Sequence, residues 1–161
     1  MHIAIAIWAL LAALKWADWK RWNEFLPTIY FMVSMNLLYQ YIAHSRYHLW
    51  TFEQNLPNEL VTDTLYGFLV FPCTVMLFLS NYPNEKGSII FHYLKWILIY
   101  CTLEWIGKEY GFMSYSHGWS LKWSVFFNCI MFPMLRLHHV KPLWALGISP
   151  LIIFILLTLF Y

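Results

Sequence analysis

The stretch FHYLKWILIYCTLEW, residues 91–105, decides the fold class of this chain. It is apolar enough for a membrane-spanning helix, yet it carries His92, Lys95 and Glu104. An ionisable group inside a bilayer is costly unless it is paired or hydrated, so each of these residues marks a candidate functional position. On a helix, Lys95 and Glu104 point to opposite sides and lie about 13 Å apart along the axis, so they cannot pair with each other. We therefore expect each charge to have its own partner.

The composition of the whole chain points to the same class. Of the 161 residues, 61% are hydrophobic and 11% are charged, whereas soluble domains carry about 25% charged residues. Aromatic residues make up 21% of the chain, which fits aromatic belts at two membrane interfaces. We therefore predict an all-α, polytopic transmembrane bundle that forms a single domain.

Six apolar segments joined by short loops are the predicted spans. The first is not preceded by a basic region, so we expect it to be retained and not cleaved as a secretory signal. Between the first two, Trp16, Trp19 and Trp22 recur at helical spacing among charges, which predicts a short interfacial helix at 15–22. Pro150 is expected to interrupt the last span. The predicted spans are residues 2–16, 26–43, 60–79, 88–106, 119–135 and 142–161.

The distribution of lysine and arginine predicts the orientation. Six spans place both termini on one side of the membrane. The first, third and fifth loops hold more basic residues than the other side, which favours those loops as cytoplasmic and both termini as outside. The two sets are Lys15, Lys20, Arg21, Lys86, Arg136 and Lys141 against Arg46, Lys108 and Lys122.

This orientation brings polar side chains from four helices toward the outer leaflet. A convergent polar set in an apolar bundle predicts a ligand pocket. The alternative is that these residues are polar because water lies near the helix ends, and that Glu104 forms an ordinary pair with Lys108 one turn away. The pocket residues are Gln40, His44, Glu59, Asp63, Tyr100, Glu104, His117, Trp119, Lys122 and Asn128.

Basic residues at the opposite, cytoplasmic side form a second candidate site. They could receive an anionic lipid headgroup, or they could simply anchor the protein by the positive-inside rule. No basic block is interleaved with aromatics, so no nucleic-acid partner is implied. The headgroup residues are His92, Lys95, Arg136, His139 and Lys141.

Metal and disulfide chemistry receive little support from the sequence. His44 and His48 are one turn apart and could bind a metal together with Glu59 and Asp63. The metalloprotease signature is absent, however, and we expect neither a metal nor a cofactor. The three cysteines, Cys73, Cys101 and Cys129, lie in apolar spans. An odd number argues against a disulfide framework, so we expect small buried hydrophobes.

Three functions remain open. The first is binding or passage of a small polar or amphipathic ligand. The second is an intramembrane enzyme that acts on a lipid or isoprenoid with Glu59, Asp63 and Glu104 as acid and base. The segment Pro57-Asn58-Glu59 is faintly similar to the Pro-x-Glu-Glu/Asp element of small-subunit lycopene cyclases, although Leu60 replaces the second acid. The third is a structural subunit that assembles with itself or with a membrane partner.

Five short motifs spread over most of the chain carry a further resemblance. They are Leu69-Val-Phe-Pro72, Leu79-Ser-Asn-Tyr-Pro83, Glu104-Trp105, Tyr115-Ser-His-Gly-Trp119 and Met134-Leu-Arg-Leu-His138. In these motifs the chain resembles an uncharacterised family of small polytopic membrane proteins from spore-forming Gram-positive bacteria. The resemblance implies a bundle of several helices in a bacterial cell membrane. It implies no activity, so no catalytic residue is carried over.

Overall fold

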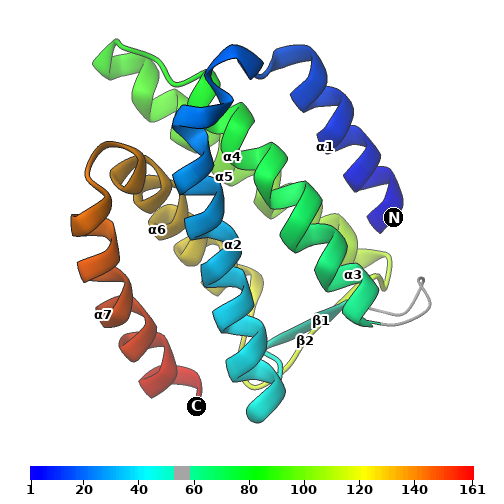
Figure 1. Cartoon of the computed structure of the whole chain (residues 1–161). Coiled ribbons are helices and arrows are strands. Elements are labelled where there is room, and N and C mark those ends of the chain that lie inside the picture. Colours follow the sequence, from blue (N-terminus) through cyan, green and yellow to red (C-terminus); the bar gives the residue numbers. More distant parts are fainter. Residues whose placement is uncertain (53–58) are drawn as a thin grey trace.

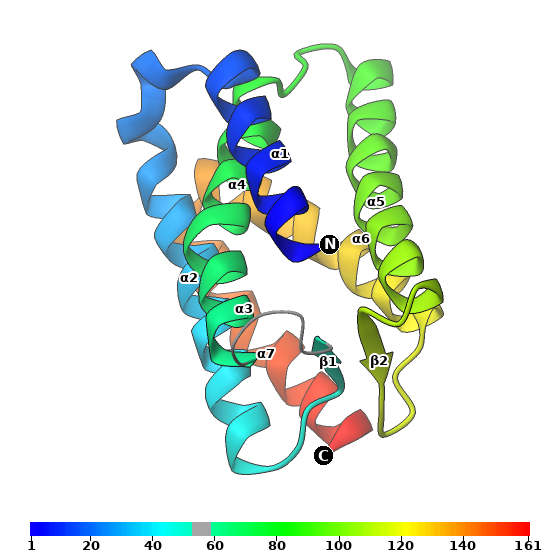
Figure 2. The ribbon, with the colours of Figure 1, turned by 90° about the vertical axis from the view of Figure 1, so that its right-hand side faces the viewer.

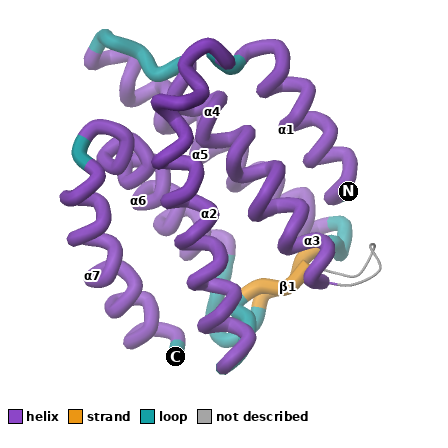
Figure 3. The backbone as a smooth tube through the Cα atoms, in the orientation of Figure 1, coloured by secondary structure: helices purple, strands orange, loops and turns teal. Residues whose placement is uncertain are grey.

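The chain folds as a bundle of helices with one very short sheet (Figure 1, Figure 3). The structure is a computed structural model that describes residues 1–52 and 60–161 in full, together with the backbone of Glu59. The predominance of helix confirms the predicted all-α class. In chain order the elements are α1 (His2–Trp16), η1 (Trp19–Arg21), α2 (Trp22–Ser45), β1 (Trp50–Phe52), α3 (Glu59–Leu65), η2 (Tyr66–Val70), α4 (Phe71–Ser80), α5 (Lys86–Glu109), β2 (Met113–Tyr115), α6 (Leu121–Val140) and α7 (Pro142–Phe160).

Within the described residues, three helical stretches are long and apolar enough to cross a membrane, which indicates a membrane location. They are Leu60–Ser80, which joins α3, η2 and α4, and the helices α5 and α7. A fourth span is added only if α1 and the stretch Trp19–Ser45, bent by 91° relative to each other, count as one broken span. The prediction of six separate spans is therefore not supported. The 15 residues of α1 fall short of the roughly 20 that a bilayer requires, and α6 contains too many polar residues.

The turns between helices divide the bundle into two ends (Figure 1, Figure 2). The α1–α2 and α4–α5 turns lie together at one end, and the sheet lies at the other. The end of α6 also belongs to the first end, because the Arg136 guanidinium lies 4.2 Å from the ring centroid of Tyr82 in the α4–α5 turn. We call this end the basic end, defined by Lys15, Lys20, Arg21, Lys86, Arg136 and Lys141.

The predicted interfacial helix at 15–22 is instead the single 3₁₀ turn η1. The Asp18 side chain caps this turn by accepting a hydrogen bond from the backbone N–H of Lys20, which stops α1 from continuing. The Asp18 backbone N–H also donates to Ser80 Oγ at 2.9 Å, which ties the corner to the end of α4. The three tryptophans of this corner are exposed, as headgroup-depth rings are expected to be: Trp16, Trp19 and Trp22.

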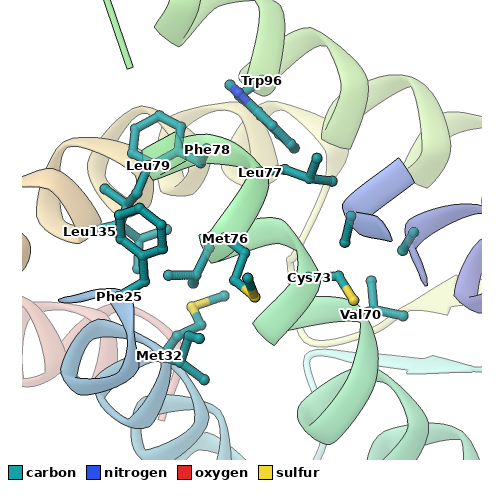
Figure 4. Packing of buried hydrophobic residues seen from close by; sticks show 14 of the residues in the cluster. Phe25, Met32, Val70, Cys73, Met76, Leu77, Phe78, Leu79, Trp96 and Leu135 are labelled. Atoms are coloured by element: carbon teal, nitrogen blue, oxygen red, sulfur yellow. The ribbon is translucent and has the colours of Figure 1, made fainter. Parts of the chain in front are cut away.

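Side chains near the basic end pack tightly, and we call this region the packed half, defined by Phe25, Phe78, Phe132 and Leu135. The three phenylalanines are completely buried, and the rings of Phe78 and Phe132 lie 5.3 Å apart between centroids. Figure 4 shows how α4 lies at the centre, with side chains from α2, α5 and α6 around it. All residues from 73 to 79 on α4 are buried, because neighbouring helices surround it on every side.

A π-helical turn, η2, joins α3 to α4. It ends two residues before Pro72, whose ring would clash with the carbonyl four residues earlier in a regular α-helix. Gly67 within the turn permits a close approach of α2, since a Cβ at this position would lie 2.9 Å from Asn36 Nδ2. The wider turn therefore keeps Leu60–Ser80 continuous while α2 packs closely against it.

The predicted interruption of the last span at Pro150 is wrong, because α7 continues through this residue. Proline is tolerated inside membrane helices when neighbouring groups compensate for the missing backbone hydrogen bond. In the preceding turn the Ser149 hydroxyl donates to the Ala145 carbonyl at 2.8 Å.

Two segments predicted as loops form a small antiparallel sheet. Strand β1 pairs with β2 in a register that places Trp50 opposite Tyr115 and Phe52 opposite Met113. The strands come from residues that follow α2 and α5, so the sheet connects the ends of these two helices. This contact positions the side chains described next.

Candidate functional site

A cavity of about 340 Å³ lies among α1, α2, α4, α5, α6 and α7, and residues of both strands line part of it. Its wall is mostly apolar, and its volume falls at the small end of ligand sites, which enclose roughly 300–1,000 Å³. The three phenylalanines of the packed half do not line it. The polar side chains that do include Asn36, Tyr100, Glu104, Trp119, Ser124 and Asn128.

Glu104 is the centre of a hydrogen-bond network at the sheet end of the cavity. The Tyr115 hydroxyl donates to Glu104 Oε1 at 2.7 Å, and the Ser124 hydroxyl donates to the same oxygen. Trp119 Nε1 in turn donates to Ser124 Oγ at 2.9 Å. The two donors to Glu104, Tyr115 and Ser124, confirm the prediction that this carboxylate has a protein partner and does not face lipid alone.

The short sheet holds Tyr115 in place over Glu104. Its partner in the register, Trp50, stacks on Tyr39 of α2 with ring centroids 4.3 Å apart. Trp50 also lies against Trp119, at 5.0 Å between centroids. Burial, followed by the hydrogen bond to Glu104, raises the pKa of the Tyr115 phenol. The phenol therefore remains a donor at neutral pH.

The second oxygen of Glu104 is left for another donor. Both hydrogen bonds fall on Oε1, and Oε2 has no hydrogen bond to any described residue. In the described part of the chain the carboxylate also forms no ion pair. Lys108 lies over the Tyr115 ring at 5.0 Å from its centroid, and Lys122 is exposed on the first turn of α6. Chemically, Glu104 can accept a hydrogen bond from a hydroxyl or an amine in the cavity.

The separation of Lys95 from Glu104 is also confirmed. Lys95 is exposed, and its Nζ lies 5.8 Å from the centroid of the Trp96 ring. Neither residue forms an ion pair among the described residues.

A second group of polar side chains lies one helical turn from Glu104, about 6 Å along α5. The Tyr100 hydroxyl donates to Thr74 Oγ1 of α4 at 2.8 Å. Asn128 Nδ2 lies 3.8 Å from Cys101 Sγ, which is a weak contact across α5 and α6. The Tyr100 and Thr74 hydroxyls are thus satisfied within the protein, whereas two other lining residues, His2 and Trp96, each have a buried ring nitrogen without a hydrogen-bond partner among the described residues.

The structure brings together four of the predicted pocket residues and separates the others. Tyr100, Glu104, Trp119 and Asn128 line the cavity. Of the others, those that the structure describes do not line it. Gln40 and Asp63 are half-buried, whereas His44 and Lys122 are exposed. His117 is also exposed, and its ring stacks on Tyr47 at 3.7 Å between centroids. The side chain of Glu59 lies outside the described residues, as do Pro57 and Asn58.

Two members of the Glu104 network were missing from the predicted pocket. Ser124 carries a usable signal, because it lies one turn before Asn128 on the same face of α6. Tyr115 carries none, since its position depends on a sheet formed by segments far apart in the sequence.

The predicted lipid-headgroup residues also separate. His92 is buried, and its Nε2 donates to the Phe78 carbonyl at 3.0 Å, so it is occupied inside the packed half. Lys95 and Lys141 are exposed, and Arg136 and His139 are half-buried at the basic end. Only the α6–α7 corner therefore keeps two of the predicted cations close together in the sequence and available to solvent or lipid.

The described residues contain no group of three or more His, Cys, Asp or Glu side chains that could hold a metal ion. The cysteines are free thiols. Cys73 is buried and Cys101 is half-buried, but Cys129 is exposed on α6, so the prediction of three buried cysteines is wrong for this one. A small apolar side chain that faces lipid loses little, which explains why it is tolerated there.

Fold and site together define a helical protein with three helical stretches long and apolar enough to span a membrane among the described residues, and with a mostly apolar cavity that contains a hydrogen-bonded carboxylate. No protein-family model, curated protein or solved structure matches the chain.

Proposed function

We propose that this protein binds an amphipathic small molecule in the cavity, with a hydroxyl or amine head at Glu104 and an apolar body between the helices. The observation that carries this proposal is the arrangement at Glu104. Two protein donors hold one carboxylate oxygen, and the other oxygen has no described partner in a cavity whose wall is mostly apolar.

The energetics favour a donor as the head group. A carboxylate in apolar surroundings is costly without compensating hydrogen bonds or charge. Because no described cation pairs with Glu104, a ligand donor would lower this cost. The apolar wall would at the same time favour a hydrocarbon body, at roughly 25 cal/mol per Å² of apolar surface removed from water.

The enzyme alternative has less support. An acid and base pair requires two titratable groups near the same reacting atoms. Glu104 lines the cavity, whereas Asp63 lies on α3 outside its lining. The described carboxylates thus do not converge, and we do not assign a reaction.

For the setting of this site, we propose a multi-pass protein of a bacterial cell membrane with the basic end in the cytoplasm and both termini outside. The candidate spans support the membrane location, the clustering of basic turns at one end supports the orientation, and the family resemblance of the five motifs supports a bacterial cell membrane. With the native cysteines replaced by serine, Tyr110→Cys should react with a membrane-impermeant thiol reagent in intact cells, and Lys20→Cys should not. Equal labelling from outside would contradict this orientation.

The binding proposal is tested with three probes of equal chain length: a long-chain primary alcohol, the corresponding primary amine and the corresponding methyl ether. Trp119 belongs to the Glu104 network, so binding should change the tryptophan fluorescence of the purified protein. The alcohol and the amine should bind, and the ether, which has no donor, should bind much more weakly.

Glu104→Gln should weaken amine binding by about tenfold or more, because a hydrogen bond to a charged group contributes about 1.5–3 kcal/mol. The matched control is Glu109→Gln, the same substitution at an exposed position of the same helix. Equal binding of all three probes, or equal effects of both substitutions, would contradict the proposal.

A further inference from the structure

The corner between α6 and α7 carries an open surface groove that shares only Met134 with the lining of the internal cavity. It has a volume of about 480 Å³ and combines two cations with apolar side chains. It is lined by Pro133, Met134, Arg136, Leu137, Val140 and Lys141.

Arg136 is oriented in this groove without a carboxylate partner. Its guanidinium lies 4.2 Å from the centroid of the Tyr82 ring, and the Tyr82 hydroxyl is itself held at 3.1 Å from the Tyr93 hydroxyl. When a guanidinium stacks on an aromatic face, its N–H groups stay free to donate to an acceptor that lies in the plane of the guanidinium. No hydrogen bond or ion pair to another described residue occupies them.

The charges around the groove leave a net positive field. Within the described residues the only ion pair is Arg21–Glu24, at 2.7 Å, so the nearest acid of α2 is already paired. Lys141 is exposed at the end of α6, and the half-buried His139 lies beside Phe25, at 5.7 Å between centroids. An anion is therefore the favoured occupant.

The apolar part of the groove identifies the kind of anion. Val140 is 54% exposed next to Lys141, and Leu137 forms part of the groove beside Arg136. A free inorganic ion would leave these side chains without a partner, whereas a lipid has hydrocarbon directly below its phosphate. The groove also lies at the basic end, where the turns between the helices gather.

We propose that this corner binds an anionic phospholipid, with Arg136 and Lys141 on the phosphate and the first acyl carbons against Leu137 and Val140. The bidentate fork of Arg136 distinguishes this site from general attraction between basic loops and an anionic surface, because a planar guanidinium can donate to two phosphate oxygens at once, whereas a lysine binds phosphate as a point charge. The proposal is independent of the ligand at Glu104.

The experiment uses the full chain in phosphatidylcholine nanodiscs into which phosphatidylglycerol is introduced stepwise. Bound lipid is counted by native mass spectrometry, and the melting temperature is measured in parallel. The wild-type protein should retain phosphatidylglycerol in preference to phosphatidylcholine and melt at a higher temperature when it is present. Arg136→Gln should reduce this retention about tenfold or more, and Arg136→Lys should recover only part of it.

Two further variants keep the test decisive. Lys141→Gln changes an exposed side chain and should also weaken retention, so it carries the test if Arg136→Gln fails to fold. Lys122→Gln removes a positive charge from the opposite end of α6 and should leave retention unchanged. Equal losses in Lys141→Gln and Lys122→Gln would show non-specific attraction and overturn the proposal. Inorganic phosphate at equal concentration should not displace the lipid, and full displacement would identify a free-anion site instead.

Discussion

The two ends of the bundle are held together by different kinds of contact. In the packed half, Phe25, Phe78 and Phe132 are completely buried and meet across α2, α4 and α6. Toward the sheet, the same helices separate around a cavity of about 340 Å³, and hydrogen bonds to Glu104 connect α5, α6 and β2. One end therefore depends on apolar contact, and the other depends on a few directed polar contacts around a space.

This difference shows how a small membrane bundle can hold a cavity without losing its fold. Dispersion contacts among close-packed side chains stabilise the helix arrangement near the basic end. The cavity end gives up such contacts, and the Glu104 network fixes its geometry instead. Stability and ligand binding are thus assigned largely to different residues, and this separation can be tested with paired substitutions.

The largest expected effect comes from Phe132→Ala in the packed half. Truncating a fully buried phenylalanine costs about 3–5 kcal/mol of unfolding free energy, because the neighbouring helices cannot collapse into the space. The matched control is Phe127→Ala on the same helix, where the half-buried ring already lines the cavity. Chemical unfolding in detergent should show a clearly smaller loss for Phe127→Ala. Equal losses would mean that the two ends do not differ as described.

Glu104→Leu should have the next largest effect. It removes the acceptor of Tyr115 and Ser124, and stranded buried polar groups cost about 1–3 kcal/mol. Glu104→Gln keeps an acceptor oxygen and should unfold close to the wild-type midpoint. If the leucine variant were as stable as the wild-type protein, the network would contribute nothing to the cavity end.

Several of these features could be predicted from the sequence, and the reasons are physical. The apolar segments and their 3.6-residue period predict helices directly. The burial cost of a carboxylate predicts a partner for Glu104, and the structure supplies Tyr115 and Ser124 as donors. Lys122, one of the predicted pocket residues, is exposed instead, because a long basic side chain at a helix end can reach solvent or headgroups.

The remaining features depend on long-range contacts that no local pattern contains. The sheet pairs residues 50–52 with residues 113–115, and each segment alone reads as a loop. The π-helical turn at Tyr66–Val70 results from Pro72 together with the close approach of α2 at Gly67. Counting apolar segments also overestimates the number of spans. Helices α1 and α6 belong to the bundle, but neither alone has the length and composition of a full membrane span.

Tyr115→Phe should have a smaller effect than Glu104→Leu. It removes one of the two donors to Glu104 Oε1 and leaves Ser124 in place, so the expected loss is about 1 kcal/mol. The cavity should persist, and binding of the long-chain amine should change less than in Glu104→Gln. A larger loss than in Glu104→Leu would show that Tyr115 supports the sheet more than the carboxylate.

The smallest expected effect is the coupling between Lys95 and Glu104. A double-mutant cycle with Lys95→Glu and Glu104→Lys should give an interaction free energy within about 0.5 kcal/mol of zero, because the two residues share no partner. Rescue of the single variants by the double variant in an unfolding assay would contradict the positions of these side chains on α5.

The pairing of β1 with β2 also determines the stage of synthesis at which the Glu104 network can form. Strand β1 is synthesised early. Its partner β2 is synthesised only after α3, α4 and α5. Pairing between segments so distant in sequence is slow to form because the intervening chain must first be ordered. Ser124 and Trp119 are translated later still. We therefore expect Glu104 to be synthesised before its donors and to gain them only once β2 has paired with β1 and α6 has begun to form.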